Sequence, residues 1–176
     1  MAQVHLIEGP VGAGKSTYAR GLEQEGRGVH IALDAWFAAL FSPDRPAENW
    51  LPWYIERKER LLRLIWAHAE RLLDSGHDVI LELGLIQRAA RLPFCQQVIA
   101  AGHPLCIHVL DAPTELRRER VQRRNAEQGP TFSMVVPDAV FDMASQFWEA
   151  PDAFECEQFR VEWVAALGAL EATRRG

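Results

Sequence analysis

Residues 9–16 read Gly9-Pro10-Val11-Gly12-Ala13-Gly14-Lys15-Ser16, which is the pattern G-x-x-x-x-G-K-S of a phosphate-binding loop. The apolar residues 4–7 before it predict a buried strand, and residues 16–22 after it predict a helix. The loop requires this order, because glycines let backbone amides point at a phosphate and the start of a helix adds a positive dipole end. The sequence therefore predicts a nucleotide-binding domain of the α/β class.

Each residue type in this loop has an expected task. Lys15 can reach the outer phosphates of a nucleotide, and the Ser16 hydroxyl can bind Mg²⁺. Backbone amides of the glycines and their neighbours can surround the phosphates. The predicted nucleotide-binding residues of the loop are Gly9, Gly12, Ala13, Gly14, Lys15, Ser16 and Thr17.

The composition limits the class of protein. The chain has 176 residues, of which 48% are hydrophobic, enough for one well-packed domain over residues 1–176. Its 24 acidic and 19 basic residues give a net charge of −5. Proteins that bind long nucleic acids usually carry a basic surplus, so the charge disfavours a nucleic-acid partner.

Cysteine and histidine usage gives further expectations. Cys95, Cys106 and Cys156 are odd in number and far apart, as in reduced thiols of a cytoplasmic protein. The six histidines show no metal-ligand spacing, and His5 and His108 lie in apolar runs that predict core or strand positions. No apolar run has transmembrane length, and the chain enters its first strand at once, so we expect no membrane partner and no signal peptide.

Apolar runs alternate with segments of helical periodicity along the chain. The clearest helix is predicted over residues 54–73, with Gly76 as its stop signal. This alternation predicts a parallel sheet with helices on both faces, and ligands bind such sheets at the carboxyl ends of the strands. The five predicted strands span residues 4–8, 29–33, 79–83, 105–110 and, more weakly, 159–162.

Two carboxylates lie at or near the carboxyl ends of predicted strands. Asp34 follows the second strand, where it could accept a proton from an acceptor hydroxyl or hold a magnesium-bound water; alternatively, it caps a helix over 35–41. Glu82 lies in an apolar strand, where a charge is costly without a partner. That partner is either a magnesium-bound water or an ion pair with Arg88 or Arg91.

Arginines dominate residues 117–124, which read Arg-Arg-Glu-Arg-Val-Gln-Arg-Arg. Helical spacing puts Arg117, Arg120 and Arg124 on one stripe. Such a stripe suits a phosphoryl group with developing charge or an adenine face, although a solvated basic helix face is the alternative. The Gly- and Pro-containing segment 125–137 predicts a mobile loop behind this helix, as in lids that exclude water.

Several other residues are candidates for an acceptor pocket. Arg88 and Arg91 follow the third strand and could hold an anionic acceptor or a phosphate. The proline-rich segment 41–53 follows the second strand. Trp36, Trp50 and Trp53 could line a pocket there, with core packing as the alternative.

Most of the chain resembles small P-loop kinases of the AAA_33 and gluconate-kinase-like type, and the loop is the highly specific part of this resemblance. Residues 9–17 resemble their loop, and residues 112–125 followed by 134–151, with Phe147-Trp148-Glu149-Ala150-Pro151, resemble their lid region. The resemblance implies ATP as the nucleotide. It also implies a P-loop NTPase fold with a five-stranded parallel sheet, helices on both faces and an arginine-bearing lid over about 117–137.

The resemblance also implies roles for three residues. Asp34 matches the acidic position that serves the acceptor or magnesium. Arg120 matches the lid arginine that lies over adenine, and Arg124 matches the arginine that reaches toward the phosphates.

The sequence departs from the family pattern at several positions. Ala35 and Phe37 stand where many relatives have a second Asp and an Arg, which argues against a polynucleotide-kinase type of acceptor. Glu82 stands where many relatives carry Asp. Residues 34–40 are also similar to chloramphenicol phosphotransferases, which end the same strand with a single Asp. An acceptor similar to gluconate therefore does not follow.

These observations predict a Mg-ATP-dependent kinase for a hydroxyl group of a small molecule. Two alternatives are a kinase for a nucleotide sugar or a nucleic-acid end, and an ATPase or nucleotide-binding switch with a protein partner. The oligomeric state stays open. The predicted catalytic residues are Lys15, Asp34, Arg120 and Arg124, and the predicted magnesium residues are Ser16, Asp34 and Glu82.

Overall fold

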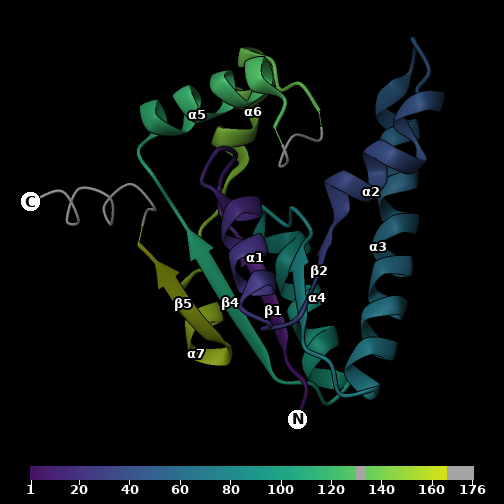
Figure 1. Ribbon diagram of the computed structural model, residues 1–176, viewed down its shortest axis with the longest axis vertical. Coiled ribbons are helices and arrows are strands. Elements are labelled where there is room, and N and C mark those ends of the chain that lie inside the picture. The colour runs from purple at the N-terminus through teal and green to yellow at the C-terminus, as the bar shows by residue number, and fades with distance from the viewer. Residues whose placement is uncertain (130–133, 166–176) are drawn as a thin grey trace, which may run out of the picture.

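The computed structural model describes residues 1–129 and 134–165 and contains one five-stranded sheet (Figure 1). All four strand pairings are parallel, and the strand order is β2-β3-β1-β4-β5. The predicted five-stranded parallel sheet is therefore confirmed. The strands are β1 (Val4–Glu8), β2 (Val29–Ala32), β3 (Val79–Glu82), β4 (Leu105–Leu110) and β5 (Arg160–Val164).

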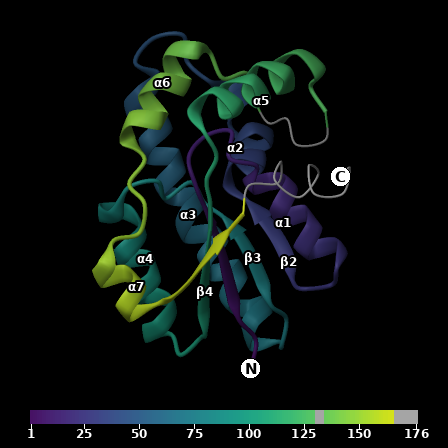
Figure 2. The same cartoon turned by 90° about the vertical axis from the view of Figure 1, so that its left-hand side faces the viewer.

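Helices cover both faces of the sheet (Figure 2). Helix α1 packs on one face, whereas α3 and α4 pack on the other. A parallel sheet needs such cover because each connection crosses over one of its faces. The helices of the described ranges are α1 (Lys15–Gln24), α2 (Leu33–Leu40), α3 (Trp50–Asp74), α4 (Arg88–Ala100), α5 (Thr114–Glu127), α6 (Asp138–Phe147) and α7 (Ala153–Gln158), with a 3₁₀ turn η1 (Ser42–Asp44).

The core follows from the alternation of side chains along the strands. Val4 and Leu6 of β1 face α3 and α4, whose buried residues include Ile65 and Val98. Ile7 faces α1 and packs with Leu22. Since both faces of β1 are buried, its sequence reads as an almost continuous apolar run.

Helix α2 begins earlier than the sequence predicted. Strand β2 ends at Ala32, and Leu33 is already the first residue of α2, where it is buried in the core. Asp34 therefore lies in the first helical turn and not at the strand end. The N-cap of α2 is Ala32 and no side chain caps it, so the alternative role of Asp34 as a helix cap is wrong.

Two helices, α5 and α6, form a layer beyond the carboxyl ends of the strands (Figure 1). Arg118 of α5 pairs with Asp142 of α6 at 2.6 Å, and the Phe141 ring is fully buried between the two helices. Asn125 bonds both backbone groups of Val136, at 2.8 and 3.1 Å. Part of the predicted mobile loop, residues 130–133, lies outside the described residues.

None of the helices in the described ranges has the length and apolarity that a bilayer crossing requires. The three cysteines are free thiols, as expected, with Cys95 and Cys106 buried and Cys156 exposed.

Candidate active site

The predicted phosphate loop connects β1 to α1, and its glycines are required by its path. Gly9, Gly12 and Gly14 have φ angles of 151°, 79° and 99°, and Gly14 is the N-cap of α1. These values lie in the region that L side chains rarely adopt. A Cβ on Gly9 would lie 2.3 Å from the Leu110 carbonyl oxygen, and one on Gly12 would lie 2.5 Å from that of Arg117. The loop is therefore packed against the end of β4 and the first turn of α5.

Lys15 folds back over this loop. Its Nζ donates to the carbonyl oxygens of Gly9 at 2.8 Å and Pro10 at 3.1 Å. Burial lowers the pKa of Lys15, and three neighbouring carboxyl groups, including that of Glu82, oppose this effect. A cation held at the mouth of a glycine loop can exchange these carbonyl contacts for phosphate oxygens.

Glu82 connects the loop to the end of β3. Ser16 Oγ donates to Glu82 Oε1 at 2.8 Å, and His30 Nε2 lies 3.4 Å from Glu82 Oε2. Burial alone would raise the pKa of Glu82, but its contacts with His30 and Ser16 and the charge of Lys15 bring that pKa below its ordinary value. Glu82 is thus an anion beside the Ser16 hydroxyl. The predicted alternative, an ion pair with Arg88 or Arg91, is wrong.

Both of those arginines have other partners. Arg91 is fully buried and forms two hydrogen bonds with Glu155, at 2.8 and 2.9 Å. Arg88 Nε donates to Asp152 at 2.6 Å. Asp152 also forms a capping box with Glu155 at the start of α7. These arginines therefore hold α7 against α4, and the prediction that they bind an anionic acceptor is not supported by this geometry.

Asp34 lies among the charged groups of the site. Its side chain is exposed, yet desolvation by the surrounding protein, followed by the negative charge of Glu82, raises its pKa. Tyr54 is affected in turn: burial and the charge of Asp34 raise its pKa to about 12. A carboxylate with a raised pKa is a better proton acceptor than an ordinary Asp.

The arginine stripe of α5 faces the loop, but its members differ. Arg117 is buried and donates to the carbonyl oxygens of Val11 at 3.0 Å and Ala112 at 3.1 Å, which makes it a structural support.

The other two arginines contact the loop or act on charged groups of the site. Arg120 Nη1 lies 3.4 Å from the Ala13 carbonyl oxygen. Arg124 Nε is buried and has no hydrogen-bond partner within residues 1–129 and 134–165. The charge of Arg124 adds to the lowering of the Lys15 pKa and opposes the rise of the Asp34 pKa, so it acts on the site.

Glu8 is a functional candidate that sequence reasoning missed. It ends β1 directly before Gly9, is fully buried, and neither of its carboxyl oxygens has a hydrogen-bond partner among the described residues. Burial raises its pKa to about 7, although the charges of Lys15 and Arg91 oppose this. The signal in the sequence is an acidic residue at the end of an otherwise apolar strand.

The predicted tryptophan pocket is mostly core packing. Trp53 contacts the buried Phe37 ring, with 5.9 Å between centroids, and Trp36 packs against the same core. Trp50 is 41% exposed and stacks with Arg45, whose guanidinium carbon lies 4.4 Å from the ring centroid. A hollow of about 410 Å³ lies elsewhere, between Pro10 of the loop and Trp148.

Comparisons with known proteins identify a family and similar folds. A family model described as an AAA domain matches residues 4–151. A sugar kinase from Janibacter sp. HTCC2649 is 17% identical with a TM-score of 0.62, over 94% of this chain and 86% of that one. Kti12 from Chaetomium thermophilum in complex with ADP-AlF3 is 18% identical with a TM-score of 0.68, over 98% and 94% of the two chains.

A gluconokinase from Sinorhizobium meliloti 1021 is also similar, with 18% identity and a TM-score of 0.55 over 94% of this chain and 83% of that one. None of the curated proteins matches the sequence. Identities this low show a shared fold. The predicted P-loop fold is therefore confirmed.

Proposed function

The chain belongs to the AAA domain family, and from this premise we propose that it is a kinase, which transfers the γ-phosphate of ATP to a hydroxyl group of a small molecule. This membership confirms the family resemblance found in the sequence. The kinase-like fold supports phosphoryl transfer as the reaction class. The proposal includes a small-molecule acceptor and ATP as the nucleotide. It also includes a reducing, cytoplasmic location, which the three free thiols favour.

The observation that carries the proposal is the convergence of Lys15, Ser16 and Glu82. They come from the loop, the first turn of α1 and the end of β3, and the Ser16 hydroxyl links to the Glu82 carboxylate at 2.8 Å. In a doubly covered parallel sheet, this carboxyl edge is where ligands bind. A phosphate-binding lysine beside a hydroxyl and a carboxylate is the set of groups that nucleotide-dependent phosphoryl transfer uses.

The residues present fit a magnesium nucleotide. Glu82 Oε2 is a buried carboxylate oxygen whose neighbour in the described ranges is His30 Nε2, at 3.4 Å, a contact that a magnesium-bound water could take over. Ser16 supplies a second oxygen ligand. When bound, Mg-ATP supplies an activated phosphoryl group whose charge the metal partly neutralises.

The chain's own residues then bind the nucleotide, orient the acceptor and exclude water. The loop amides and Lys15 hold the outer phosphates, and Lys15 leaves the Gly9 and Pro10 carbonyls to do so. Asp34 orients the acceptor hydroxyl and takes its proton at a carboxylate oxygen. Arg120 and Arg124 balance negative charge from the α5 side. Most of the rate gain comes from this positioning and electrostatic stabilisation.

The experiment that tests the proposal measures ADP release from Mg-ATP across sugars, sugar acids, nucleosides, nucleotide sugars, hydroxylated antibiotics and oligonucleotides with free 5′ ends. We expect one compound class to raise turnover, and Lys15→Ala to abolish it. Exposed Arg123→Ala on α5 serves as the matched control and should keep full turnover. Stimulation by oligonucleotides would mean that the acceptor is a nucleic-acid end and not a small molecule. Steady turnover that no compound changes would instead favour an ATPase or switch.

A further inference from the structure

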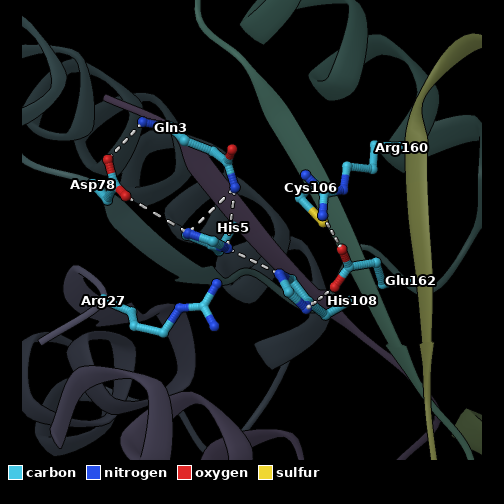
Figure 3. A pocket seen from close by; sticks show the side chains of 8 residues that line it. All are labelled: Gln3, His5, Arg27, Asp78, Cys106, His108, Arg160 and Glu162. Atoms are coloured by element: carbon cyan, nitrogen blue, oxygen red, sulfur yellow. Dashed lines mark hydrogen bonds and ion pairs between the residues drawn. The ribbon is translucent and has the colours of Figure 1, made fainter. Parts of the chain in front are cut away.

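A second polar cluster lies on the α1 face of the sheet, between β1, β4 and β5 (Figure 3). It lines a pocket of about 270 Å³. None of its residues belongs to the phosphate site, and the kinase proposal uses none of them. The pocket contains a thiol, two imidazoles and two carboxylates, which is an unusual set for the interior face of a sheet.

Strand register brings the members together. Cys106 and His108 are two residues apart on β4, so both side chains point to the same face. Glu162 of β5 is the direct register partner of His108, and His5 of β1 is that of Cys106. The sequence could not reveal this, because Glu162 lies far along the chain and its neighbourhood depends on the pairing of an edge strand.

The geometry of three side chains fits one metal ion. Cys106, His108 and Glu162 each offer a ligand atom, and these atoms all lie within 4.8 Å of one another. His108 Nδ1 and Glu162 Oε2 are 3.6 Å apart. Ligands of a tetrahedral zinc ion, bonded at about 2.0–2.3 Å, lie roughly 3–4 Å from each other. We propose that Cys106, His108 and Glu162 bind a divalent transition metal of the zinc type.

A hydrogen bond and a longer charge contact behind His108 fit this role. His108 Nε2 lies 2.9 Å from His5 Nδ1, and His5 Nε2 faces Asp78 Oδ2 at 3.9 Å (Figure 3). If His108 Nδ1 binds the metal, its Nε2–H donates to His5, whose own Nε2–H points at Asp78. Metal-binding histidines usually have such a partner on the second nitrogen, which orients the ring.

Charge selects the metal class. Arg160 donates to Glu162 Oε1 at 2.5 Å, which leaves Oε2 for the metal, and Arg27 also lines the pocket. Two guanidinium groups offset the carboxylates of Glu162 and Asp78, so the pocket has little attraction for a hard cation such as Mg²⁺. Affinity must come from bonds to sulfur and nitrogen, which favour zinc-type ions.

Binding would have two local consequences. Tyr18 Oη lies 3.0 Å from His108 Nδ1, so this hydroxyl must yield its contact to the metal. The metal would also join β4 to the edge strand β5, because two ligands come from β4 and one from β5. It would therefore stabilise the fold, and phosphoryl transfer would not need it.

The test titrates the reduced full-length protein with Co²⁺ and then displaces it with Zn²⁺. We expect one equivalent to give thiolate-to-cobalt charge-transfer absorption. Zn²⁺ at a hundredfold excess over its Kd should raise the Tm by about 7 °C. Absence of the absorption band and of the Tm rise would overturn the proposal, even if the kinase proposal holds.

Variants locate the site. Cys106→Ala should abolish the band, whereas Cys156→Ala, which removes the exposed thiol, should keep it. Because Cys106 is buried, Glu162→Gln is the milder variant: it should weaken Co²⁺ binding at least about tenfold with the metal-free Tm unchanged. Tyr18→Phe should bind at least as tightly as the unmodified protein. A band that Cys156→Ala removes, or that Glu162→Gln leaves at full affinity, would contradict the assignment.

Discussion

Ser16 Oγ donates a 2.8 Å hydrogen bond to Glu82 Oε1, which joins the phosphate loop to the end of the neighbouring strand β3. The sequence predicted either a magnesium-bound water or an arginine as the partner of Glu82. The partner is Ser16, and His30 lies on the other side of the carboxylate. Glu82 is therefore held as an anion where a metal bound to Ser16 would lie.

Replacing Glu82 should separate metal use from folding. We expect Glu82→Gln to lower turnover about 10–100-fold and to raise the Mg²⁺ concentration needed for half-maximal activity, because a water-holding charge is lost. The measurement is turnover against Mg²⁺ concentration, with the exposed Glu119→Gln as the control. An unchanged Mg²⁺ dependence would leave Glu82 as a structural partner of Ser16 only.

Asp34→Asn tests the proton acceptor. The amide keeps the shape of the carboxyl group but accepts no proton, so we expect nucleotide affinity to stay the same and transfer to fall about 10²–10⁴-fold. Calorimetric titration with a non-hydrolysable ATP analogue gives the affinity, and product formation gives the rate. Asp44→Asn, in the nearby turn η1, should change neither quantity. If Asp34→Asn transfers phosphate at the normal rate, another group is the base.

The arginine stripe should divide into a structural and a functional part. Arg117→Ala removes hydrogen bonds to Val11 and Ala112 and should destabilise the fold by about 3 kcal/mol in denaturant titrations. Arg124→Ala should change stability by less than about 0.5 kcal/mol and lower turnover at least tenfold. The opposite result, a stable Arg117→Ala protein and a destabilised Arg124→Ala protein, would reverse these assignments.

Local patterns predicted the parts of the fold that local chemistry determines. The phosphate loop and β1 lie as the sequence predicted, since glycine spacing and an apolar run define both. Helix α2 began earlier than expected because Leu33 gains burial in the core as a helical residue.

Contacts between distant segments were not predictable in this way. Arg91 looked free to bind an anion, but its partner Glu155 lies 64 residues later and meets it only after α7 packs on α4. His108 looked like a core residue, and only the pairing of β4 with β5 brings Glu162 beside it. Such partners depend on tertiary packing, which spacing along one segment does not encode.

Glu8 provides a prediction about pH and stability. Its carboxyl group is buried beside the loop, and burial raises its pKa from the ordinary value of 4.5 to about 7. A group whose pKa is higher in the folded state favours folding at low pH. That contribution is fully present below pH 4.5 and is lost as the pH rises to about 7. Above pH 7 the buried carboxylate should cost the fold about 3 kcal/mol.

Glu8→Gln removes this titration and keeps the shape of the side chain. Any cost of burying the amide is the same at every pH, so the change between two pH values isolates the carboxyl group. Between pH 5 and pH 8, the free energy of unfolding of Glu8→Gln should rise by about 2–3 kcal/mol relative to that of the unmodified protein. Urea titrations at both pH values measure this difference, and Glu119→Gln should show none. Parallel pH profiles for Glu8→Gln and the unmodified protein would mean that Glu8 ionises normally, which would require a partner or a water at its carboxyl group.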